Sequence, residues 1–194
     1  IGFILIQCSS IAFSEERVLT FSRIQTNPDQ VVAGEIIKVA YKRLGITAIV
    51  KGMPGKRALI QSSEGFVDGE TIRLSGIEKI YPTLIRVPTP INFIEGAVFS
   101  KKYQFKISGW SSIKDYKIGL VRGVKFSEAG TKGFPRIQIA PSIESLMQMI
   151  DLGRVDVGVV ARLNGILTLK KLKINTVSVL EPPLNRIDTY HYLH

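Results

Sequence analysis

Hydrophobic and polar residues follow one another along the chain in patterns that predict strands and helices in turn. The segment 17–24, RVLTFSRI, alternates apolar and polar residues, which is typical of a strand. In the next segment, 31–46, apolar residues recur at helical spacing and Gly45 ends the pattern. We expect a helix there, with a buried face made of Ala33, Ile36, Ile37, Ala40 and Leu44.

The alternation of strand and helix continues to about residue 102. We expect strands over 47–54, 66–74 and 95–102, and a helix over 55–65. The segment 83–91 reads as extended, but Pro88 and Pro90 argue against a central strand, because proline cannot donate a ladder hydrogen bond. This order indicates an α/β architecture with a mostly parallel sheet.

The pattern then restarts and predicts a second α/β unit of similar size. Residues 127–134 read as the start of a helix or as a loop. Ser142 is expected to cap a helix whose buried face holds Ile143, Leu146, Met147 and Ile150. The other elements expected here are strands over 116–123, 136–141, 155–161 and 174–180, the last ended by Glu-Pro-Pro, and a helix over 162–172.

The chain is basic, with 26 Lys and Arg against 16 Asp and Glu and a net charge of +10. These basic residues are spread along the sequence and form no run of five or more. We therefore interpret the charge as a solvated surface and expect no nucleic-acid partner.

The first 14 residues are interpreted as the remnant of a signal peptide, because an apolar run precedes Ala12-Phe13-Ser14, with cleavage expected before Glu15. The run is too short to span a membrane, which takes about 20 residues. Cys8, the single cysteine, is the alternative lipidation site, and without it the mature chain holds neither disulfide nor zinc–thiolate site. We expect a periplasmic location, and a C-terminus that looks truncated.

The order of these segments, with GEIIKVAYKRLGI, DGETIR, GLVRG and GRVDVGVV among them, resembles the extracytoplasmic solute-binding proteins of ABC transporters. Within that group it is similar to the amino-acid-type family 3, over residues 17–194. The resemblance implies the type II periplasmic-binding-protein fold, in which two α/β lobes are joined by two crossing strands. It implies lobes over 15–95 and 100–180, with 183–194 returning to the first, and hinge strands near 91–100 and 179–192.

Candidate ligand contacts in the first lobe follow from this resemblance. It implies that Arg73 pairs with a ligand carboxylate, which a planar guanidinium matches with two hydrogen bonds. Asp68 and Glu70 either shape a loop or receive a ligand donor. Arg57 lies at the start of a helix, where it either faces the cleft or is exposed to solvent.

The second lobe departs from the family pattern at two places. After Gly123, where the family has a hydroxyl for the ligand carboxylate, stand Val124 and Lys125, so that Ser127 or backbone N–H groups would have to substitute and Arg122 could add charge.

The second departure lies in GRVDVGVVAR, residues 153–162, where Ala161 replaces the acid that receives the ligand's α-ammonium in the family. Asp156 then has a structural role, and the favoured ligands lack an α-amine or have it paired elsewhere. Arg162 follows, so a small polar or anionic solute is expected. Trp110 either stacks on the ligand or packs in a core.

Catalytic signatures are missing from the sequence. His191 and His194 have no further metal ligands nearby in sequence, and neither a Ser-His-Asp order nor a phosphate loop occurs. We expect a monomeric binding protein without enzymatic activity or cofactor, which delivers its solute to a membrane permease. The alternatives are the ligand-binding input domain of a signalling protein and a non-transport relative of the fold.

Overall fold

The computed structural model describes residues 17–194, so the predicted signal-peptide remnant and Cys8 lie outside the described residues. The elements are β1 (Arg17–Ile24), α1 (Pro28–Arg43), β2 (Ile46–Met53), α2 (Gly55–Ser63), β3 (Gly69–Leu74), η1 (Ile77–Lys79), β4 (Ile85–Ser100), η2 (Trp110–Ile113), β5 (Ile118–Val121), α3 (Lys125–Gly130), β6 (Ile137–Ala140), α4 (Ile143–Asp151), β7 (Val157–Ala161), α5 (Arg162–Leu172) and β8 (Ser178–Leu193).

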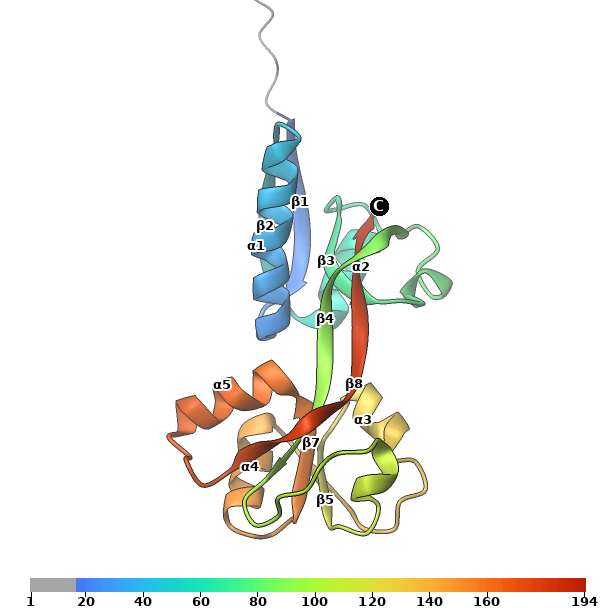
Figure 1. The fold of residues 1–194 in the computed structure, drawn as a ribbon. Coiled ribbons are helices and arrows are strands. Elements are labelled where there is room, and N and C mark those ends of the chain that lie inside the picture. The colour runs from blue at the N-terminus through green and yellow to red at the C-terminus, as the bar shows by residue number, and fades with distance from the viewer. Residues whose placement is uncertain (1–16) are drawn as a thin grey trace, which may run out of the picture.

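The strands form one mixed sheet in the order β2-β1-β3-β8-β4-β7-β5-β6. The pairs β1–β2, β1–β3, β5–β6 and β5–β7 are parallel, whereas β3–β8, β4–β8 and β4–β7 are antiparallel. Figure 1 shows two groups of elements joined by the long strands β4 and β8. We call β1–β3 with α1, α2 and η1 the first lobe, and β5–β7 with α3–α5 and η2 the second lobe. This confirms the two-lobed α/β fold, while the predicted lobe boundaries stay a prediction.

Helix α1 begins three residues earlier than the sequence pattern indicated. The side chain of Asn27 caps it by accepting from the backbone N–H groups of Asp29 and Gln30. The predicted buried face is only partly right, because Ala33 and Ile37 are buried whereas Ile36 and Leu44 are exposed. The buried face is rotated toward Asp29, Gln30 and Gly34, which lie against the sheet.

The prolines of β4 and β8 do not end these strands, contrary to what the sequence indicated. Strand β4 runs through Pro88 and Pro90, and its register with β8 shifts on both sides of Pro90. Strand β7 joins β4 only at Gly96–Phe99, so the proline part of β4 has a partner on one side. A strand with one open side tolerates proline there. Strand β8 likewise continues through Glu-Pro-Pro to Leu193, where the sequence had predicted an end.

Each lobe has its own buried core. Phe21, Ile37 and Ile72 are buried in the first lobe, together with Tyr192 of β8, which pairs with β3. In the second lobe, apolar clusters cover both faces of the sheet, and one of them holds the predicted residues Leu146, Met147 and Ile150 of α4. Ser142 caps α4 as expected, accepting from the backbone N–H of Ser145 at 3.1 Å. Each lobe is thus stabilised by its own core, and the space between the lobes is bounded by two separately packed units.

Candidate functional site

A cavity of about 260 Å³ lies where the first turn of α1 faces α5 beside β4. Figure 1 shows the lower end of α1 above α5, next to the strands that join the lobes. The lining residues are Asp29 and Val32 of α1, Asn92, Phe93 and Glu95 of β4, and Arg162, Leu163 and Ile166 of α5. We call this space the interlobe cavity, because its walls come from both lobes and from a strand that connects them.

Two neighbouring cavities extend this space along α5. Val32 and Leu163 also line a cavity of about 410 Å³, and that cavity shares Pro28 and Leu167 with a third of about 460 Å³. Because neighbouring cavities share lining residues, the three form one groove between the start of α1 and the length of α5.

Asp29 is the buried acid of the interlobe cavity. Asp29 is 6% exposed, and its backbone N–H donates to Asn27 Oδ1 at 2.9 Å. Its Oδ2 is buried and has no hydrogen-bond partner among the described residues. Burial raises the pKa of Asp29, and a backbone hydrogen bond partly opposes that rise. The carboxylate is therefore poorly solvated unless something enters the cavity.

Arg162 lies where β7 ends and α5 begins. Its Nη1 donates to Glu181 Oε2 at 2.8 Å, its Nη2 donates to the other oxygen of Glu181, and its Nε lies 3.8 Å from Glu95 Oε2. The hydrogen bond from Arg162 lowers the pKa of Glu181. The guanidinium is thus paired with acids of both connecting strands, since Glu95 belongs to β4 and Glu181 to β8.

Asn92 and Phe93 hold the β4 wall of the cavity in place. Asn92 Nδ2 lies 3.5 Å from the backbone oxygen of Asp29, and Asn92 Oδ1 accepts from the backbone N–H of Phe93 at 2.9 Å. The Phe93 ring is covered by the guanidinium of Arg186, 3.6 Å from its centroid. These contacts tie the connecting strand to the first turn of α1.

Of the segment 153–162, only Arg162 lines the cavity, so this segment contributes no carboxylate to it. Asp156 Oδ2 accepts from the backbone N–H of Lys117 at 2.9 Å, which fits the structural role expected for it. Ala161 is buried and occupies the N-cap position of α5, where it offers no side-chain hydrogen bond.

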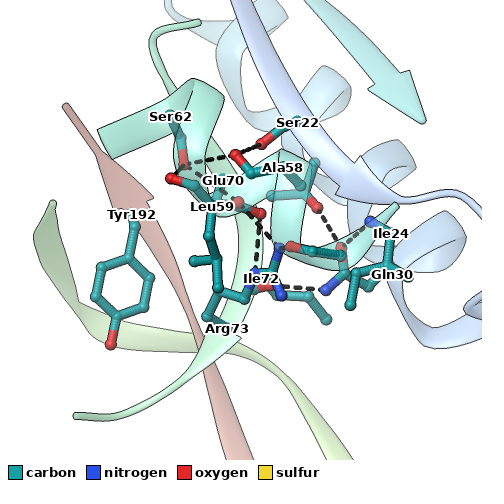
Figure 2. Close-up of polar contacts among 12 residues, drawn as sticks. Ser22, Ile24, Gln30, Ala58, Leu59, Ser62, Glu70, Ile72, Arg73 and Tyr192 are labelled. Carbon is teal, nitrogen blue, oxygen red and sulfur yellow. Dashed lines mark hydrogen bonds and ion pairs between the residues drawn. The ribbon is translucent and has the colours of Figure 1, made fainter. Parts of the chain in front are cut away.

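Of the eight candidate residues from the sequence, only Arg162 lines the interlobe cavity. Arg73 and Glu70 instead form an ion pair inside the first lobe, shown in Figure 2. Arg73 Nε lies 3.0 Å from Glu70 Oε2, and Arg73 Nη2 donates to Glu70 Oε1 and to the backbone oxygen of Gly55. A ligand contact by Arg73 stays a prediction, and the pairing gives it a structural task.

Asp68 and Arg57 also lie away from the interlobe cavity. Asp68 Oδ2 accepts from the backbone N–H of Thr20 at 2.7 Å, and Asp68 lines a separate cavity of about 360 Å³ that includes His194. Arg57 is exposed in the first turn of α2.

The second-lobe candidates Arg122, Ser127 and Trp110 are not brought to the cavity either. Ser127 is buried and its hydroxyl donates to the backbone oxygen of Val124 at 2.9 Å. Trp110 packs against a core cluster and over Gly130, and Arg122 is exposed after β5. Their roles as ligand contacts stay predictions.

Sequence reasoning missed Asp29, Asn92 and Glu95 as cavity residues. Asp29 in NPDQ has the ordinary signature of an acid in a first helical turn, and Asn92 and Glu95 lie in a segment whose prolines hid the strand. Within residues 17–194, no group of three or more His, Cys, Asp or Glu could hold a metal ion. In the same range, no helix is long and apolar enough to cross a membrane.

Comparisons with known proteins find similarity in structure but not in sequence. No family model and no curated protein matches the chain. An ancestral arginine-binding protein bound to arginine matches with a TM-score of 0.66 and 16% identity, over 91% of this chain and 84% of that one. EhuB in complex with hydroxyectoine matches with a TM-score of 0.63 and 19% identity, over 91% and 76% of the chains.

A third solved structure is a histidine kinase sensor domain with similarity to periplasmic binding proteins. It matches with a TM-score of 0.62 and 12% identity, over 92% of this chain and 83% of that one. The three structures are binding proteins and a sensor domain rather than enzymes. At these identities the similarity concerns the fold, and by its fold this chain is an α/β protein of the two-lobed, type II periplasmic-binding-protein kind.

Proposed function

We propose that this chain is an extracytoplasmic binding protein that captures a small polar, amino-acid-like solute between its two lobes. The observation that supports this most directly is the interlobe cavity, whose lining combines charged, amide and apolar side chains from both lobes. Its volume of about 260 Å³ is close to the lower end of the range for small-molecule pockets, roughly 300 to 1,000 Å³. Two solved structures of the same fold hold arginine and hydroxyectoine.

Capture would be linked to closure of the lobes about β4 and β8. A ligand that touches α1, α5 and β4 together interacts better with a closed form than with an open one, and so shifts the population toward closure. In the transport role, the permease of an ABC importer recognises that closed form. We propose that the chain acts as a monomer.

The second candidate function is the ligand-binding input of a signalling protein. The observation that favours it is the similarity to the histidine kinase sensor domain, which is nearly as close in TM-score as the binding proteins are. Reconstitution separates the two functions. A transport role predicts that loaded protein stimulates ATP hydrolysis by a permease in proteoliposomes, and a sensor role predicts no such stimulation.

A thermal-shift screen with amino acids, dicarboxylates, keto acids and small peptides tests binding itself, because a ligand of the folded state raises the melting temperature. Val32→Trp fills the interlobe cavity and should abolish the shift. Val39→Trp places the same side chain at an exposed position on the same helix, outside that cavity, and should keep it. A shift that survives in Val32→Trp would place the ligand elsewhere, and a flat response to the whole panel would refute the proposed binding function.

A further inference from the structure

We propose that the interlobe cavity recognises a primary ammonium group, with the Asp29 carboxylate as its main acceptor and Glu95 as a second acid. This inference rests on the proposed function of the same cavity and names the chemical class of its ligand. It takes up one of the two alternatives that Ala161 left open, namely that the ligand's amine is paired elsewhere in the cleft.

The charges of the lining favour a cation. The lining holds two acids, Asp29 and Glu95, and one base, Arg162, whose Nε lies 3.8 Å from Glu95 Oε2. Arg162 is already paired with Glu181 on the β8 side, so its positive charge is offset before a ligand arrives. The side chains that line the cavity therefore include one more acid than base, although the whole chain carries a net charge of +10.

The hydrogen bonds of Asp29 point to the same conclusion. Its Oδ2 is a buried acceptor without a partner among the described residues, in a residue that is only 6% exposed. A buried carboxylate oxygen without a donor costs free energy, and a group that supplies N–H donors removes that cost. An ammonium group carries three donors and no acceptor, so it fits beside an acid.

The position of Asp29 explains how the chain manages without an acid at the start of α5. Ala161, at the N-cap of α5, offers no carboxylate on the second lobe, while Asp29 lines the interlobe cavity from α1 of the first lobe. Asn92 contacts the backbone of Asp29, which keeps this turn against β4. In this chain the buried acid of the cavity therefore lies on the α1 wall.

The test uses the full chain and matched solutes that differ in one group. The probes are leucine and alanine, their 2-hydroxy-acid analogues, and the diamine putrescine, each followed by thermal shift and calorimetry. We expect amine-bearing probes to bind and their hydroxy analogues to bind at least about tenfold more weakly, the effect of one charged hydrogen bond. The variant Asp29→Asn should lose about 10- to 100-fold in affinity for the amines.

The control Asp115→Asn removes the same charge from an exposed loop position and should leave the affinity unchanged. Asp29→Asn should also keep or raise the melting temperature of the ligand-free protein, because it removes a poorly solvated carboxylate. A loss of both affinity and stability would indicate a structural role for Asp29 and overturn the inference. A second variant, Glu95→Gln, repeats the test, and we expect it to weaken amine binding while the fold is kept.

The outcomes separate this inference from the proposed function. Equal binding of hydroxy acids and amines, or full amine affinity in Asp29→Asn, would overturn the ammonium site while solute binding stands. An absence of binding by every probe here and in the wider panel would overturn both.

Discussion

Among single residues, Glu70 shows how a buried charge depends on one partner. The Glu70 side chain is completely buried, and the Arg73 side chain that pairs with it is 11% exposed. Burial raises the pKa of Glu70, while the Arg73 guanidinium and the Ser62 hydroxyl act against that rise. Figure 2 shows this cluster, with Ser22 and Tyr192 labelled on either side of it. The pair therefore stabilises the lobe that carries Asp29.

Arg73→Ala should destabilise the protein by about 3 to 5 kcal/mol, because it leaves the Glu70 charge buried and unpaired. Urea denaturation measures the loss. Arg57→Ala, at an exposed position with the same change of side chain, should stay within about 0.5 kcal/mol of wild type. The double variant Glu70→Gln/Arg73→Met should recover much of the loss, and similar curves for the two single variants would contradict the structural role.

His191 makes stability depend on pH in the neutral to mildly acidic range. The ring is buried, with Nδ1 2.7 Å from the backbone oxygen of Glu70 and Nε2 3.0 Å from Tyr41 Oη, so the neutral ring donates at Nδ1 and accepts at Nε2. Burial lowers the pKa of His191 below its ordinary value of 6.5. As pH falls through 6.5, the unfolded chain takes up a proton that the folded chain excludes, so stability falls.

The free energy of unfolding should therefore drop by up to about 1.4 kcal/mol per pH unit below about pH 6.5. Melting temperatures measured between about pH 7.5 and pH 5.5 should show this slope in wild type and lose most of it in His191→Gln. His194→Gln, which removes the exposed histidine, is the control and should keep the slope. Identical slopes for all three proteins would rule out His191 as the source.

The residue scale is also where the sequence was least informative. Arg162 was predicted as a ligand contact and does line the cavity, whereas Asp29 gave no signal beyond an acid in a first helical turn. Whether such an acid faces solvent or a second lobe depends on contacts between segments far apart in sequence. Local pattern carries no information on those contacts, so the composition of the cavity could not be predicted.

At the scale of elements, hydrophobic periodicity predicted most boundaries well. It placed α5 at residues 162–172 and β1 at 17–24, as observed. It failed where tertiary pairing overrides a local rule, as in the prolines inside β4 and β8. It also misjudged the buried face of α1, where five of the eight apolar residues are exposed, namely Val31, Val32, Ile36, Val39 and Ala40.

Gly165 tests how tightly α5 packs on β4. In the interior of a helix, Gly→Ala normally stabilises by about 1 kcal/mol. At Gly165 an added Cβ would collide with the Phe99 ring, which is fully buried. We expect the cost of overpacking against Phe99 to exceed the gain in helix propensity, so that Gly165→Ala lowers the free energy of unfolding by about 1 to 2 kcal/mol.

Denaturant unfolding measures this change, with Lys170→Ala in the same helix as the control, expected within about 0.5 kcal/mol of wild type. A stabilised Gly165→Ala variant would mean that α5 can move away from β4. Such freedom would contradict the close packing of Gly165 on the Phe99 ring.

At the scale of the whole molecule, the net charge of +10 has a consequence for stability. Like charges repel in the compact state, and salt screens them, with a Debye length falling from about 30 Å at 0.01 M to about 8 Å at 0.15 M. The melting temperature should therefore rise by a few degrees, roughly, over this range of ionic strength. A melting temperature that falls with salt would show that attractive ion pairs such as Lys171–Glu144 dominate instead.

The route of the chain through the two lobes also sets the order in which the protein can be completed. Strands β1, β2 and β3 leave a sheet edge that only β8 covers, through pairs such as Gly69 with Leu193. During synthesis, all three strands of the second lobe, β5 to β7, emerge before β8. The first lobe is therefore synthesised first but completed last, when β8 pairs with it. Until then its exposed strand edge could pair with another chain, which is a route to aggregation.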